Sequence, residues 1–256
     1  MNRRSVIRFF VLGMMLTLGA LWLPHAAFAA EPIPGISIDI GNTDEPGGVS
    51  NTIMIILLIT VLSLAPAILV LMTSFTRIVI VLGFVRTSLA TQQMPPNQVI
   101  IGLALFMTFF IMSPTLSQVN NEALQPYLNG QMDQATALSN ASLAMKEFMI
   151  AHTREKDLAL FLEYARAERP ATVADIPLTV LVPAYTISEL KTAFQIGFMI
   201  FIPFLVIDMI ISSVLMAMGM MMLPPVMISL PFKILLFILV DGWYLVVKSL
   251  LISFNM

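Results

Sequence analysis

Cysteine is absent from this sequence of 256 residues, and charged side chains are scarce. Only 11% of the residues are charged, whereas soluble domains carry about 25%. The absence of cysteine excludes a disulfide framework and thiolate chemistry. The net charge of −2 gives no reason to expect a nucleic-acid partner. What remains is apolar: 58% of the residues are hydrophobic and the mean hydropathy is +0.92, which predicts an integral membrane protein.

Sequence patterns that signal catalysis are missing as well. His152 is the only histidine beyond the first thirty residues, so one chain cannot build a multi-histidine metal site. The chain contains no His-Glu-x-x-His or Gly-x-Ser-x-Gly pattern, and no glycine loop that would cradle a phosphate. We therefore expect no enzyme, no cofactor and no bound metal.

The first thirty residues are typical of a targeting segment. Three arginines within the first eight residues precede the apolar run Phe9–Leu23, and an Ala-x-Ala pattern ends at Ala29. Fifteen apolar residues reach about 22 Å as a helix, short of the roughly 30 Å hydrocarbon core. We predict a signal peptide that is cleaved at Ala29 and leaves the mature N-terminus outside a bacterial inner membrane.

Four long apolar stretches follow and predict helices long enough to span a bilayer. Arg77 and Arg86 lie between the first two, which places that segment in the cytoplasm by the positive-inside rule. Prolines inside or beside the stretches would interrupt the helical hydrogen bonds at membrane depth. Such interruptions are tolerated where other protein surrounds the backbone, so the prolines indicate oligomerisation. The stretches are Ile53–Phe75, Thr87–Asn121, Phe194–Met218 and Val226–Phe254.

A polar segment separates the second and third stretches, and its periodicity predicts amphipathic helices over Ser142–Thr153 and Glu155–Glu168. We predict an all-α integral membrane protein built of helical hairpins, with a small helical periplasmic domain. The expected parts are a signal peptide (1–29), a periplasmic linker (30–50), a first hairpin with a cytoplasmic-side loop (51–119), the periplasmic domain (120–186) and a second hairpin with a methionine-rich loop (187–256).

The charged residues within the last two apolar stretches include Asp208, Lys233 and Asp241. A charge at mid-bilayer costs about 2.5–3.5 kcal/mol, so such residues pair or line a polar path. Their spacing lets Lys233 reach Asp208 within a chain or across a subunit interface. A structural ion pair and a proton-coupled relay are both open, and an aspartyl protease dyad of Asp208 and Asp241 is a weaker alternative.

The turn between these stretches, MAMGMMMLPP at Met216–Pro225, holds five methionines in seven residues. No charge occurs between Ile210 and Phe232. Methionine is flexible and polarizable. Two interpretations of the turn are open. It either provides ordinary apolar packing at a subunit interface, or the turns of several subunits together form a deformable, uncharged ring that closes a hole on their shared axis.

Three segments stand out as long motifs: TSFTRIVIVLGFVRTSLATQQMPPNQV (Thr73–Val99), PAYTISELKTAFQIGF (Pro183–Phe198) and PFKILLFILVDGW (Pro231–Trp243). They resemble the FliP family of the flagellar type III export gate and its injectisome counterparts. The resemblance implies a pentamer in a conical assembly with FliQ, FliR and a FlhB-type component. It implies a channel through which unfolded flagellar proteins leave the cytoplasm.

The resemblance also implies roles for individual residues. Met220, Met221 and Met222 match the family's channel gasket, and Asp208 with Lys233 matches an ion pair that supports assembly. Residues expected to contact neighbouring subunits are Glu189, Lys191, Phe148 and Arg154. A proton-coupled permease for small solutes and an intramembrane protease remain the alternative functions.

Overall fold

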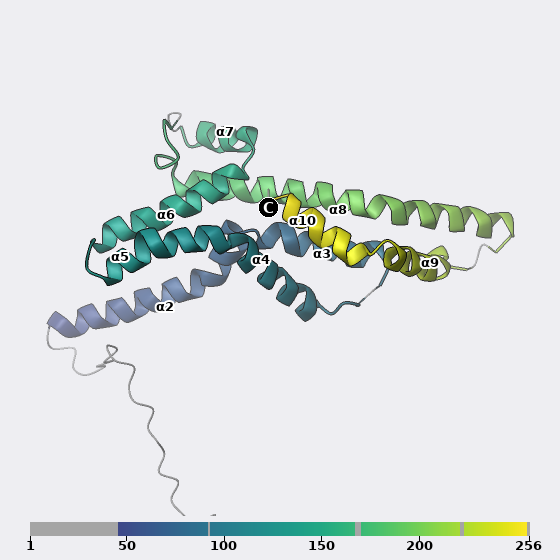
Figure 1. Cartoon of the computed structure of the whole chain (residues 1–256), viewed down its shortest axis with the longest axis horizontal. Helices are drawn as coiled ribbons and strands as arrows, with labels where there is room; N and C mark the ends of the chain where they lie inside the picture. Colours follow the sequence, from purple (N-terminus) through teal and green to yellow (C-terminus); the bar gives the residue numbers. More distant parts are fainter. Residues whose placement is uncertain (1–45, 92, 167–169, 221–222, 255–256) are drawn as a thin grey trace, which may run out of the picture. The chain divides into compact units, whose positions relative to one another are not determined.

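The computed structural model describes residues 46–91, 93–166, 170–220 and 223–254, and these residues form helices and turns without a strand (Figure 1). The predicted all-α fold is confirmed. The chain divides into two compact units, residues 1–60 and 61–256. In the first unit the structure describes the beginning of helix α2 (Pro46–Met72). The predicted signal peptide and its cleavage at Ala29 lie outside the described residues.

The second unit holds the end of α2 and all later helices. Two runs, 97–128 and 178–217, are each long and apolar enough to cross a membrane. Counting two bent pairs of helices as single spans gives up to four spans among the described residues, as the apolar stretches predicted. The later helices are α3 (Phe75–Ser88), α4 (Asn97–Val119), the π-helix η1 (Asn120–Leu124), α5 (Gln125–Leu128), α6 (Gln134–Ala151), α7 (Glu155–Tyr164), α8 (Leu178–Ala217), α9 (Pro225–Leu239) and α10 (Gly242–Ile252).

Helix α3 occupies the segment that the sequence placed between the first two helices. Its buried residues Ile78, Val81, Leu82 and Val85 recur at helical spacing, which is the pattern of a helix with one face in a core. That face packs on α4 and α8. The first predicted hairpin therefore contains an additional helix, which ends at Ser88 before α4 begins at Asn97.

The polar segment forms two helices near the predicted positions. Helix α6 begins eight residues before the predicted Ser142, and α7 ends at Tyr164 rather than Glu168. Pro177 then caps α8, since proline is well suited to the start of a helix. Helix α8 runs unbroken past the predicted boundary at residues 186 and 187, and the domain limits stay predictions.

Helices α3, α4, α8, α9 and α10 share the main hydrophobic core of the second unit. Ile78 and Val81 of α3, Phe204 of α8, Phe237 of α9 and Leu250 of α10 are among its buried residues. A smaller cluster joins α6 to the first turns of α8 through side chains such as Met149 and Leu181. These two cores position the charged groups described next.

Candidate functional site

An ion pair fixes the α8–α9 hairpin. Lys233 Nζ lies 2.6 Å from Asp208 Oδ2, and Ser229 Oγ donates to Asp208 Oδ1 at 2.5 Å. Ser229 and Lys233 are four residues apart on α9, so both side chains face the same stripe of α8. The lysine side chain is only 3% exposed and the aspartate 23%. Both carboxylate oxygens of Asp208 are therefore engaged within the chain.

A second ion pair is more deeply buried and joins α3 to α8. The Arg77 guanidinium contacts both oxygens of Glu189: Nη2 lies against Oε1, and Nε donates to Oε2 at 2.8 Å. The two side chains are 3% and 0% exposed. Bidentate pairing is the strong form of this interaction. Because Arg77 is neutralised inside the protein, it supports the predicted orientation less than the partly exposed Arg86 does.

The same guanidinium holds the C-terminal end of α10. Arg77 Nη1 donates to the Ser253 carbonyl oxygen at 2.7 Å and to Ser253 Oγ at 3.0 Å. Its carbon Cζ lies 3.7 Å from the centre of the Phe254 ring, a cation–π geometry. The His152 ring also lies beside Phe254, at 5.2 Å between centroids. One arginine thus ties α3, α8 and α10 together.

The four residues expected at subunit contacts lie in different surroundings. Glu189 points inward to Arg77, whereas Lys191, two residues later, is exposed. Phe148 is partly buried and packs against His152 and Tyr185 at centroid distances of 4.8 and 6.1 Å. Arg154 lies at the start of α7. Their roles between subunits stay predictions.

Arg154 belongs to a small polar network between α7 and α8. Its Nη2 lies 2.5 Å from Asp157 Oδ2, and the same oxygen accepts a hydrogen bond from Ser188 Oγ at 2.6 Å. Ser188 Oγ also accepts the backbone N–H of Arg154 at 3.1 Å. Burial raises the pKa of Asp157, but the Ser188 hydrogen bond and the Arg154 charge outweigh it and leave the pKa below its ordinary value.

The methionine-rich turn begins with a Schellman motif. Gly219 adopts a φ of 76°, its N–H donates to the Met216 carbonyl, and the Met220 N–H donates to the Leu215 carbonyl, both at 3.0 Å. Glycine is required there because other residues resist positive φ. Met216 and Met218 are exposed and Met220 is partly buried. Met221 and Met222 lie outside the described residues.

Asp241 marks a break between α9 and α10, which are inclined by 63°. It has a left-handed backbone with φ 52° and ψ 55°, which costs a non-glycine residue energy. The following residue, Gly242, lies against the Phe237 ring so closely that a Cβ would be 2.2 Å from it. Asp208 is occupied by Lys233 and Ser229, so the structure does not join the two aspartates as a dyad.

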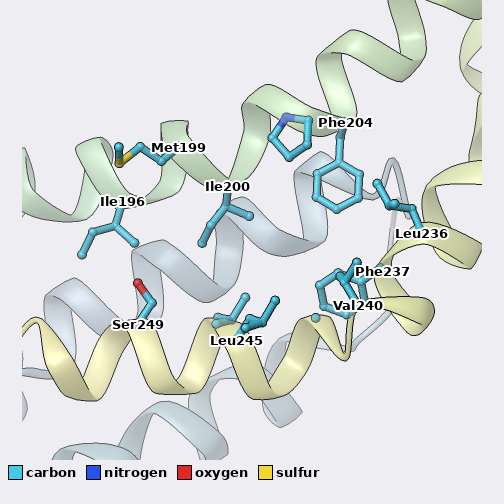
Figure 2. Close-up of a pocket in the computed structure, with 12 residues that line it drawn as sticks. Ile196, Met199, Ile200, Phe204, Leu236, Phe237, Val240, Leu245 and Ser249 are labelled. Carbon is cyan, nitrogen blue, oxygen red and sulfur yellow. The ribbon is translucent and has the colours of Figure 1, made fainter.

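An apolar cavity of about 520 Å³ lies between α8 and the bent pair α9–α10 (Figure 2). Ile200 and Phe204 face it from α8, and Phe237 and Val240 face it from α9 and the break (Figure 2). Ser249 contributes a hydroxyl. The lining has no charged side chain, and among the described residues no group of three His, Asp or Glu is placed to hold a metal.

The family model described as FliP matches residues 58–250, which include both ion pairs and the methionine-rich turn. This chain belongs to the FliP family. A protein of Bacillus subtilis (strain 168) named flagellar biosynthetic protein FliP is 67% identical over 217 residues, 85% of this chain and 98% of the relative. A protein of the same name from Aquifex aeolicus is 46% identical over 90% of this chain and 95% of its own length. A third, from Caulobacter vibrioides, is 46% identical over 96% and 90%.

Sequence reasoning missed several partners in this FliP-family chain. It did not pair Arg77 with Glu189, and it named neither Ser229 nor Asp157. Arg77 has no acidic residue near it in the sequence, but Glu189 is followed by Lys191, so the sequence did not point to Glu189 as the partner of Arg77. Ser229 has no such signal, since serine is common in apolar helices that face other helices.

Proposed function

We propose that this FliP-family chain is a channel-forming subunit of the flagellar type III export gate, through which unfolded flagellar proteins cross the inner membrane. Family membership carries the coarser statement that the chain is a component of the flagellar export apparatus. The channel, its location in the inner membrane and the periplasmic placement of the polar domain are the finer parts of the proposal.

The observation that supports a channel is the uncharged, sulfur-rich turn between α8 and α9. Its described part exposes Met216, Met218 and Leu223 at the end of a hairpin whose register is fixed by the Asp208–Lys233 pair. Thioether side chains deform around irregular surfaces. In a ring of subunits, Met220, Met221 and Met222 would form a gasket that stays dry when closed and parts for a passing chain.

The proposal includes assembly with other copies and with partners. Many large apolar side chains of α4, α8 and α9 are exposed in one chain, among them Phe106, Met199 and Leu239. An exposed apolar surface of this extent marks an interaction with lipid or protein. We propose a pentamer that binds FliQ, FliR and a FlhB-type component, in which the Asp208–Lys233 pair supports assembly and Glu189, Lys191, Phe148 and Arg154 lie at or near contacts.

The hydrogen bonds of Asp208 favour this function over a permease or protease. A coupling or catalytic carboxylate must exchange protons with substrate or water. Asp208 instead accepts from Ser229 and from a lysine that is almost fully buried. This arrangement suits a structural pair.

The test replaces Met220, Met221 and Met222 together with alanine. We expect complexes with an unchanged number of subunits that conduct small ions at rest, measured as current across planar bilayers. The control replaces three exposed methionines elsewhere, Met94, Met199 and Met209, and should stay closed. Unchanged conductance in fully assembled turn variants would contradict the gasket.

A further inference from the structure

The apolar cavity between α8 and the bent pair α9–α10 has walls that are themselves suited to a membrane. Helix α8 is one candidate span, and α9 and α10 together form another, bent one. At the rim Met199 is 73% exposed and Leu245 is 50% exposed, whereas Phe204 and Phe237 are buried. Water does not fill such a cavity, because an apolar lining offers it too few hydrogen-bond partners. In a membrane protein, the molecules that meet this opening are lipids.

The shape of the cavity is set by the break between α9 and α10. Asp241 has a left-handed backbone there, and the two helices are inclined by 63°. The Phe237 ring packs against Gly242. Its centroid lies 6.3 Å from that of Phe204 and 5.4 Å from that of Trp243. One end of the cavity is therefore closed by packed aromatic rings and backbone.

The two ends of the cavity differ in polarity. Figure 2 shows Ser249 and Ile196 toward one end, and Phe204 and Leu236 toward the other. Ser249 has the one polar side chain among the described residues of the lining. A ligand that suits both ends has a polar group at one end and a long apolar group that reaches the other. Phospholipids have this form.

The charge beside the polar end is positive. Lys248 precedes Ser249 on α10, is exposed, and forms no ion pair within the described part of the chain. Its Nζ lies 5.7 Å from the centre of the Tyr244 ring, one turn earlier on the helix. Exposed tyrosine and lysine side chains on a membrane helix are typical of the depth of the lipid headgroups. The polar end of the cavity therefore suits an anionic headgroup.

The carboxylate of α10 lies at the opposite end of this helix. Asp241 is seven residues before Lys248, about 10 Å along the helix axis. It is exposed and adjoins Val240 and Gly242, which line the apolar end. An anionic headgroup would be repelled there. The two charges of α10 thus favour one orientation of a bound lipid.

The remaining charges of α8 and α9 do not compete for a headgroup at this site. Lys233 is paired with Asp208, and Glu189 is paired with Arg77. Lys191 is exposed, but it lies five residues before Ile196, which rotates it about 140° around α8 from the side that lines the cavity.

We propose that this cavity binds one acyl chain of an anionic phospholipid, whose headgroup contacts Lys248 and Ser249. The inference goes beyond the proposed channel and requires only that α8 and α10 meet a membrane. An anionic lipid matches both the apolar lining and the unpaired cation. A zwitterionic lipid fills the lining equally well but gains less from Lys248.

The experiment measures the quenching of Trp243 fluorescence by phospholipids with brominated acyl chains. Trp243 packs on Phe237, so it reports a chain that enters the cavity. The other tryptophan of the sequence, Trp22, is replaced with phenylalanine. Protein in mild detergent receives brominated phosphatidylglycerol or brominated phosphatidylcholine. We expect saturable quenching by both, with half-saturation at an about fivefold lower concentration of phosphatidylglycerol, the ratio that one lysine near a membrane surface supplies.

The headgroup contact is tested by removing the charge. Lys248→Gln should abolish the preference for phosphatidylglycerol and leave quenching by phosphatidylcholine unchanged. The matched control Lys191→Gln removes another exposed lysine and should keep the preference. A preference that survives in Lys248→Gln would overturn the headgroup contact, as would equal quenching by the two lipids before either substitution.

The acyl-chain site is tested by filling the cavity. Ile200→Phe with Leu245→Phe should raise the half-saturating concentration of both lipids about tenfold. The control Ile202→Phe with Leu235→Phe makes the same changes at exposed positions outside the lining and should be quenched as before. If the two variants are quenched alike, Trp243 meets only surrounding lipid and the site is refuted. Lys248→Gln changes a surface residue and tests the proposal even where the filled variant does not fold.

The result is independent of the proposed channel. If a neighbouring polypeptide fills the cavity, neither lipid quenches Trp243 saturably in larger complexes, and the lipid site is refuted. The conductance of the methionine variants is unaffected by that outcome. Saturable quenching in complexes whose methionine variants stay closed would instead contradict the gasket and leave the lipid site standing.

Discussion

Replacing Arg77 with alanine should destabilise this protein more than any other removal of a single charge. The substitution leaves the Glu189 carboxylate, which is 0% exposed, without a counter-ion. Removing one partner of a buried pair costs about 3–5 kcal/mol. The total stability of a typical domain is only about 5–15 kcal/mol. The single substitution should therefore consume a large share of it.

The reason for this cost can be tested by removing both charges. In Arg77→Met with Glu189→Met no charge is stranded, and such replacements are often neutral. The Ser253 carbonyl still loses the donor that Arg77 supplied, which leaves about 1–3 kcal/mol of destabilisation. The double variant should thus be more stable than Arg77→Ala, although it changes more atoms.

The assay is thermal unfolding in detergent, followed by tryptophan fluorescence. Trp243 lies on α10, the helix whose end Arg77 holds, with its ring 5.4 Å from that of Phe237. At roughly 2–4 °C per kcal/mol for a chain of this size, Arg77→Ala should lower the Tm by roughly 6–20 °C. The control is Arg86→Ala, because Arg86 lies on the same helix and its side chain donates to the amide of Asn97 and not to a buried carboxylate. The reasoning fails if the double variant is no more stable than Arg77→Ala.

Three further predictions concern the α8–α9 hairpin, the helix break and the α7–α8 network. Lys233→Ala leaves the Asp208 carboxylate without its counter-ion, so native mass spectrometry should find fewer oligomers. The exchange Asp208→Lys with Lys233→Asp should recover them. Normal oligomers in Lys233→Ala would count against a role of the pair in assembly. Gly242→Ala pushes a Cβ into the Phe237 ring and should cost about 1–3 kcal/mol in thermal unfolding, whereas Gly102→Ala, with nothing within 4 Å, should be neutral or better; equal effects would be unexpected. The pKa of Asp157 is lowered in the folded state, so its contribution to stability is complete above the unfolded pKa of about 3.9 and is lost as the pH falls through the folded pKa. In unfolding scans below about pH 4, wild type should therefore lose more stability than Asp157→Asn. Identical pH profiles of the two proteins would show that Asp157 does not contribute in this way.

The sequence predicted the helical class and the positions of apolar segments because hydropathy and length depend on local composition. It also predicted that Lys233 lies within reach of Asp208. In a helical hairpin, the number of residues between each side chain and the turn gives its height along its own helix, so the two heights can be compared from the sequence. The Arg77–Glu189 pair joins residues 112 positions apart. No local pattern encodes such a contact, because it depends on how α3 packs against α8.

Backbone details were also beyond prediction. The apolar run Val226–Phe254 gave no sign of the helix break at Asp241. Aspartate seldom adopts a left-handed conformation, and the neighbouring glycine alone does not define a break. The start of α8 at Leu178 was hidden by polar side chains that follow it, among them Ser188 and Glu189. Ser188 donates to Asp157 and Glu189 accepts from Arg77, so their polarity reports tertiary contacts and not a loop.

Helix α8 has a length that bears on where the protein can reside. Forty residues rise about 60 Å, and even at a tilt of 40° the helix would cover about 46 Å along the bilayer normal. The hydrocarbon layer is only roughly 30 Å thick. A substantial part of this rod must therefore lie beyond the acyl chains. Its first turns are already covered by the chain itself, since Leu181 and Tyr185 are buried against α6.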